Sequence, residues 1–178
     1  QGNPQLRTQI TELYESVKAD DVVVLTSPVE GIYLAMQSLL EPDDEVIALR
    51  PAYDALNNVA RHLCREVVPW NLVATDTDWE LDFDRLASLI GPQTRMIVVN
   101  FPHNPTGFVP TAAELDRLVE LAREHDAWLF YDEIYRGLEF DTPIPSAADC
   151  YEKSIVLGGL SKTYGLPGLR AGWLVIRD

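Results

Sequence analysis

The sequence that decides the fold is Gly159-Leu160-Ser161-Lys162-Thr163-Tyr164-Gly165-Leu166-Pro167-Gly168-Leu169-Arg170, a glycine-rich loop that holds one lysine and ends in an arginine. The apolar run just before it, residues 155–157, predicts a strand, so the loop begins where a strand ends. Two other polar stretches also follow predicted strands: Asn100-Phe101-Pro102-His103-Asn104-Pro105-Thr106-Gly107 and Tyr131-Asp132-Glu133-Ile134-Tyr135. In an open α/β sheet, ligands bind beyond the carboxyl ends of the strands. The three stretches are therefore expected to converge on one rim.

Strand and helix patterns alternate along the rest of the chain. Strands are predicted over residues 22–25, 45–49, 66–69, 96–100, 128–131, 155–157 and 171–176. Helices are predicted over residues 4–18, 30–40, 53–63, 82–90 and 111–125, and a polar loop over 76–79. This order predicts an α/β fold, a three-layer α/β/α sandwich around a mostly parallel seven-stranded sheet. No helical pattern separates the last two strands, which leaves room for one antiparallel strand.

Composition narrows the classes of partner. The chain has 178 residues, with 14 basic and 28 acidic side chains and a net charge of −14. This charge argues against nucleic acid and anionic membranes as partners, and no apolar run approaches the roughly 20 residues of a membrane span. Cys64 and Cys150 could form one disulfide, but buried thiols in a reducing cytoplasm are expected. Amine chemistry has three candidate lysines, Lys18, Lys153 and Lys162.

Taken together, the three polar stretches resemble the class I and II aminotransferase family, enzymes of fold type I that use pyridoxal 5'-phosphate (PLP). The motifs occur in the family's order, and the resemblance spans nearly the whole chain. It implies that Lys162 holds PLP as a Schiff base and later moves a proton at the substrate. A solvated surface lysine is the alternative for Lys162, and the flanking glycine-rich run opposes it.

The resemblance also implies contacts along the length of the cofactor. Asp132 would pair with the pyridine nitrogen, while Asn104 and Tyr135 would hydrogen-bond the phenolate oxygen of the ring. Arg170 stands at the family's spacing for a phosphate-binding arginine. Tyr53 matches an aromatic position that stacks on the ring. In isolation, each of these residue types is also common in turns, in cores or in surface ion pairs.

The segment Thr26–Gly31 lies where family members hold the phosphate with backbone amides at a helix N-terminus. Here it departs from the usual glycine-rich form, because Pro28 has no N–H to donate. Gly159 also stands where many relatives carry a phosphate-binding serine. The residues expected at this end are Ser27, Pro28, Val29 and Ser161, with the two serines compensating for the lost donors.

The resemblance implies that residues 1–178 are the PLP-binding large domain, and that the family's N-terminal arm and C-terminal small domain are absent from this chain. The expected function is transfer of an amino group from an amino acid to a keto acid, in a full-length protein that is a cytoplasmic homodimer. The isolated piece is expected to turn over substrate poorly or not at all. Two alternatives stay open: another PLP reaction on an amino acid (lyase, decarboxylase or cyclising), or a PLP-binding sensor domain of a transcription regulator.

Overall fold

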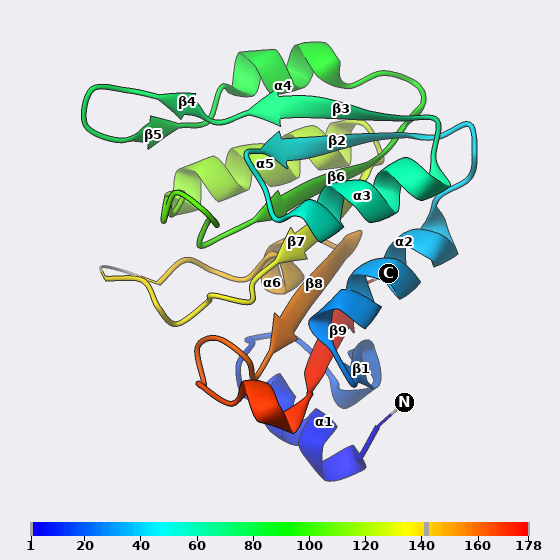
Figure 1. Cartoon of the computed structure of the whole chain (residues 1–178), viewed down its shortest axis with the longest axis vertical. Coiled ribbons are helices and arrows are strands. Elements are labelled where there is room, and N and C mark those ends of the chain that lie inside the picture. The colour runs from blue at the N-terminus through cyan, green and yellow to red at the C-terminus, as the bar shows by residue number, and fades with distance from the viewer. Residues whose placement is uncertain (1, 141–142, 178) are drawn as a thin grey trace.

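A computed structural model describes residues 2–140 and 143–177. Its main sheet has seven strands in the order β1-β9-β8-β7-β6-β2-β3 (Figure 1). The strands are β1 (Val22–Leu25), β2 (Glu45–Arg50), β3 (Glu66–Asn71), β6 (Thr94–Asn100), β7 (Trp128–Asp132), β8 (Ser154–Gly159) and β9 (Gly172–Ile176). Strands β3, β2, β6, β7 and β8 pair in parallel, whereas β9 runs antiparallel to both β8 and β1. The predicted seven-stranded, mostly parallel sheet with one antiparallel strand is therefore confirmed.

Helices cover both faces of the sheet. The helices are α1 (Pro4–Thr11), α2 (Pro28–Leu39), α3 (Asp54–Leu63), α4 (Phe83–Leu89), α5 (Ala112–Glu124) and α6 (Ala147–Cys150). Buried side chains of α2 and α3, such as Met36 and Leu56, form one apolar cluster with Phe130 of the sheet. Leu118 of α5 belongs to a second cluster with Leu129, whose side chain points to the opposite face. Two separate apolar clusters make the predicted three-layer arrangement.

The first predicted helix was too long. The helix predicted over residues 4–18 ends at Thr11. Beyond it, the Asp149 carboxylate accepts from the backbone N–H groups of Glu15 at 3.0 Å and Ser16 at 2.8 Å. These bonds satisfy donors that a continued helix would direct to its own carbonyls. A contact with a residue distant in sequence therefore overrides the local apolar periodicity.

Other short elements had no clear sequence pattern. A two-stranded ribbon, β4 (Val73–Ala74) and β5 (Trp79–Glu80), flanks the predicted polar loop. Two 3-10 turns, Ala19–Asp21 and Pro167–Leu169, and the four-residue α6 were also not predicted.

Cys64 and Cys150 are free thiols, and both are half-buried rather than buried. Among residues 2–140 and 143–177, no helix is long and apolar enough to cross a membrane.

The carboxyl ends of three neighbouring strands meet in register. Asn100 of β6 pairs with Asp132 of β7, which in turn pairs with Leu157 of β8. Each strand then continues into one of the polar stretches quoted above. The parallel sheet thus brings residues that are far apart in sequence to one edge.

Candidate functional site

A cavity of about 220 Å³ opens at the carboxyl edge of the sheet, beside the N-terminal end of α2. All ten sequence-predicted residues line it: Ser27, Pro28, Val29, Tyr53, Asn104, Asp132, Tyr135, Ser161, Lys162 and Arg170. Ile32, Asn100, Ile134 and Leu157 complete the wall. The structure therefore brings the ten residues together, and the individual role of each stays a prediction.

Asp132 forms the deepest charged group of the cavity. Asp132 is only 4% exposed and is the last residue of the buried strand β7. Burial raises the pKa of Asp132 to about 7, because a charged carboxylate is disfavoured away from water. A hydrogen bond from the backbone N–H of Ile134, at 3.0 Å, acts in the opposite direction. A cationic N–H group facing this carboxyl would favour the ionised form.

Asn100 is a site residue that the sequence reasoning missed. Its side-chain amide donates to the backbone oxygen of Asp132 at 2.9 Å, and its side-chain oxygen accepts from the backbone N–H of Asn104, also at 2.9 Å. The residue is 2% exposed. One amide therefore links the backbones of two predicted cofactor contacts. The available signal was a polar side chain that ends an otherwise apolar strand.

His103 links two loops that border the cavity. Its Nε2 lies 2.8 Å from the backbone oxygen of Pro51, and its Nδ1 lies 2.7 Å from the hydroxyl oxygen of Thr106. A neutral ring that donates through Nε2 and accepts at Nδ1 satisfies both contacts. Burial lowers the pKa of His103, which favours this neutral form. His103 thereby fixes the turn that carries Asn104 beside the loop that carries Tyr53.

The first turn of α2 also contributes to the cavity wall. Ser27 caps this helix by accepting from the backbone N–H of Val29 at 3.3 Å, and Pro28 occupies its first position, where a missing N–H disrupts no helical bond. The hydroxyls of Ser27 and Ser161, the Arg170 guanidinium and the helix N-terminus give this part of the wall the character of an anion site. Arg170 has a left-handed backbone (φ 49°).

Pro28 and Gly159, the two departures from the family pattern, are in contact. A Cβ atom at Gly159 would lie 2.9 Å from Cγ of Pro28, and one at Gly172 would lie 3.0 Å from Cδ of Pro28. Gly159 and Gly172 are register partners in β8 and β9. The proline ring thus packs on a surface that two glycines leave open, and the two departures form one packing arrangement.

Lys162 is exposed and faces the cavity from the loop after β8. Its Nζ lies 5.6 Å from the centroid of the Tyr135 ring. The amine is therefore accessible to a carbonyl carbon brought into the cavity. The cavity thus contains a buried carboxyl, hydrogen-bond donors, an amine and a guanidinium-bearing residue, and these are kinds of group that could bind the ring nitrogen, ring oxygen, aldehyde and phosphate of PLP.

Known proteins are similar to the chain in sequence and in fold. The family model for aminotransferase class I and II matches residues 1–178. The chain is 35% identical over 185 residues to the arginine–pyruvate transaminase of Pseudomonas aeruginosa, covering 98% of this chain and 46% of that protein. It is 32% identical to the capreomycidine synthase of Streptomyces vinaceus, covering 98% and 45%. A PLP-dependent aminotransferase from Streptococcus suis has a TM-score of 0.93 at 36% identity, covering 99% and 47%.

The chain therefore spans about half the length of the relatives it matches. The match covers every strand of the sheet and every loop that lines the cavity. The chain belongs to the class I and II aminotransferase family.

Proposed function

We propose that the chain is the cofactor-binding part of a PLP-dependent aminotransferase, which moves an amino group from an amino acid to a keto acid. The observation that carries this proposal is the single cavity lined by Lys162, Asp132 and the anion-binding end at Arg170. When bound, PLP supplies an electron sink for the charge that develops at the substrate α carbon. The relatives' names support the transfer reaction.

Lys162 and Asp132 carry the chemical roles in this proposal. The Lys162 amine is the point of covalent attachment, and when released it moves a proton at the substrate α carbon. Asp132 accepts a hydrogen bond from the protonated ring nitrogen. Because burial raises the pKa of Asp132 to about 7, a protonated ring nitrogen facing this carboxyl would keep it ionised at neutral pH.

The other lining residues bind and orient the cofactor. Asn104 and Tyr135 would donate to the ring oxygen, and Tyr53 would stack on the ring. The hydroxyls of Ser27 and Ser161 and the guanidinium of Arg170 hold the phosphate, while Pro28 and Val29 form the apolar wall behind it.

A cyclising PLP reaction is the second candidate. A reaction other than simple amino transfer is supported by the 32% identity to a protein named as a synthase, capreomycidine synthase, which is close to the 35% identity to the arginine–pyruvate transaminase. Screening the full-length protein with amino acids, and measuring both keto-acid release and ring-closed product, separates the two reactions. Formation of a cyclic product without amino transfer would exclude the leading proposal.

We also propose a cytoplasmic homodimer for the full-length protein. Apolar side chains near the cavity are exposed, including Val29 at 43%, Leu166 at 45% and Leu169 at 63%. A contiguous exposed apolar patch is typical of a surface that contacts another chain, and in this proposal the three side chains belong to such a patch. Sedimentation of the full-length protein as a monomer at micromolar concentration would contradict the dimer.

The test of the PLP site is spectroscopic. PLP is added to the wild-type chain, to Lys162→Ala and to the control Lys153→Ala, and the visible band of the covalent adduct is recorded. Lys153 pairs with Asp126 and does not line the cavity, so its removal is expected to leave the band unchanged. Borohydride reduction and peptide mapping should locate the cofactor on Lys162. An undiminished band in Lys162→Ala would refute the assignment.

A further inference from the structure

Lys162 and Thr163 are neighbours in sequence but line different cavities. Lys162 lines the cavity described above, whereas Thr163 lines a separate cavity of about 260 Å³ together with Glu133 and Arg136. Ile134 belongs to the walls of both. Any influence of Thr163 on a bound cofactor therefore has to act through the chain that separates the two cavities.

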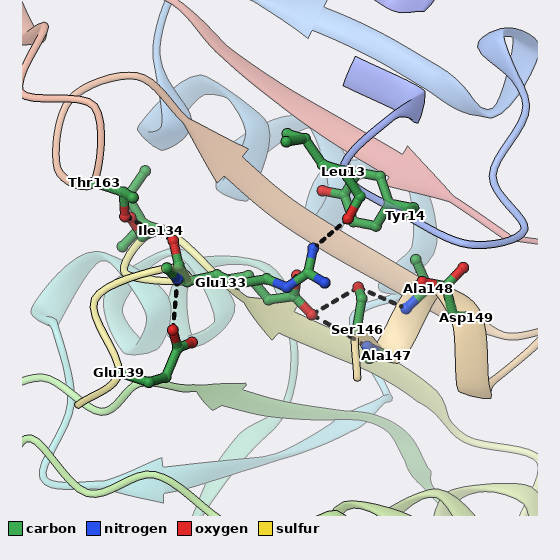
Figure 2. A network of polar contacts seen from close by, with 12 residues as sticks. Leu13, Tyr14, Glu133, Ile134, Glu139, Ser146, Ala147, Ala148, Asp149 and Thr163 are labelled. Atoms are coloured by element: carbon green, nitrogen blue, oxygen red, sulfur yellow. Dashed lines mark hydrogen bonds and ion pairs between the residues drawn. The ribbon is translucent and has the colours of Figure 1, made fainter. Parts of the chain in front are cut away.

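The Thr163 side chain contacts the backbone on both sides of Tyr135. Its hydroxyl donates to the backbone oxygen of Arg136 at 2.8 Å, and the oxygen of Ile134 lies 3.5 Å away (Figure 2). Its methyl group packs on the next residue of that segment, Gly137, where a Cβ would lie 3.0 Å from Cγ2 of Thr163. Gly137 has a left-handed backbone (φ 92°), so the turn itself favours glycine here.

The segment that Thr163 holds is anchored from the other side. One carboxylate oxygen of Glu133 accepts from the Ser146 hydroxyl at 2.8 Å and from the backbone N–H of Ala147 at 3.1 Å (Figure 2). The Arg136 guanidinium donates to the backbone oxygen of Leu13 at 2.7 Å. These bonds join the segment to α6 and to the chain after α1. Thr163 is thus hydrogen-bonded to a segment, residues 133–137, that is itself held by hydrogen bonds to other parts of the fold.

We propose that Thr163 is a positioning residue that sets the amine of Lys162 relative to the ring of Tyr135. The hydroxyl acts through the Arg136 carbonyl, and the inference rests on the proposed PLP site. Lys162 and Thr163 share a peptide bond, as do Tyr135 and Arg136, so the hydrogen bond fixes one pair of residues against the other. Without it, the loop after β8 can move away from the segment after β7, and the amine moves with it.

The experiment compares two substitutions that separate the hydroxyl of Thr163 from its methyl group. Thr163→Val keeps the shape and removes the donor, whereas Thr163→Ser keeps the donor and removes the methyl group. The control is Thr11→Val, because the Thr11 hydroxyl also donates to a backbone oxygen at 2.8 Å but lies in α1 and lines neither cavity. Three quantities are measured: the urea midpoint without PLP, the dissociation constant of PLP, and the pH midpoint of the visible band.

Thr163→Val is expected to weaken PLP binding by about fivefold, the effect of one hydrogen bond, and to shift the pH midpoint of the band. Thr163→Ser should restore both quantities, and Thr11→Val should leave both unchanged. A valine variant with a lower urea midpoint but wild-type PLP binding and pH midpoint would show a purely structural role and overturn the inference. Failure of serine to restore the spectrum would overturn it as well.

Two further outcomes are separable from these. If the wild-type chain gives no visible band with PLP, the proposed function itself fails, and the positioning role fails with it. If Thr163→Val does not fold, Thr163→Ala replaces it, because alanine removes the hydroxyl without setting a methyl group against the carbonyl. An alanine variant that binds PLP as wild type does would then overturn the inference.

Discussion

Replacing Gly159 with serine, the residue that the family resemblance implies at this position, should destabilise the protein. The new Cβ would lie 2.9 Å from Cγ of Pro28 and 2.9 Å from Cδ1 of Ile134, with the backbone oxygen of Ala171 at 3.4 Å. The Ile134 methyl can rotate away, but the proline ring cannot. Either β8 or the first turn of α2 has to shift, and such overpacking costs about 1–3 kcal/mol.

Pro28→Ala should relieve most of this cost, because it removes the ring atoms that the serine would meet. The double variant also regains a backbone N–H at position 28 and gains a hydroxyl at position 159. We therefore expect the cost of Gly159→Ser to fall by about 1 kcal/mol or more in the Pro28→Ala background, a coupling typical of residues in contact. PLP should bind more tightly to the double variant than to either single variant.

The assay is urea unfolding of the wild type, both single variants and the double variant, followed by tryptophan fluorescence at neutral pH. Gly91→Ser is a suitable control, since no heavy atom lies within 4 Å of a Cβ at Gly91. If the changes in the free energy of unfolding caused by Gly159→Ser and Pro28→Ala simply add in the double variant, the two positions are independent, which would refute the proposed packing between them.

The remaining predictions concern pH and helix capping. Without PLP, the free energy of unfolding should fall as the pH rises from about 4 to 7, because the unfolded chain releases the Asp132 proton near pH 3.8 and the folded chain only near pH 7. This corresponds to at most roughly 4 kcal/mol; Glu133 adds to the slope, and Asp132→Asn should reduce it in urea titrations across this range. Thr111→Ala should cost about 1 kcal/mol in thermal unfolding, because the Thr111 hydroxyl accepts from the backbone N–H of Glu114 at 3.2 Å. An unchanged melting temperature would contradict the capping role.

The sheet could be predicted because it depends on short-range patterns, and the set of cavity residues could be predicted because the polar stretches resemble those of a known family. Apolar runs bounded by polar or glycine-rich segments identified all seven strands of the sheet. In a parallel sheet, residues that directly follow strands must share one edge, so the chain order alone brought Asn104, Asp132 and Lys162 together. No knowledge of side-chain directions was needed for that step.

What could not be predicted depends on long-range contacts. The apolar period continues past Thr11, but the helix ends there because Asp149 captures backbone donors after it. Asn100 belongs to a strand whose pattern indicates burial, and only the three-dimensional register shows that its amide joins two loops. The contact between Pro28 and Gly159 likewise joins positions that no local pattern connects.

The antiparallel strand β9 has a consequence for synthesis of the chain on the ribosome. β1 pairs only with β9 in the described sheet, through partners such as Val22 and Val175. Residues 22–25 of β1 are synthesised early because they lie near the start of the chain. The backbone groups of β1 then have no sheet neighbour until residues 172–176 of β9 emerge from the ribosome. During that interval the nascent chain carries an open strand edge, which is a site for wrong pairing and for chaperone binding. Slow translation between these two strands would lengthen that exposure.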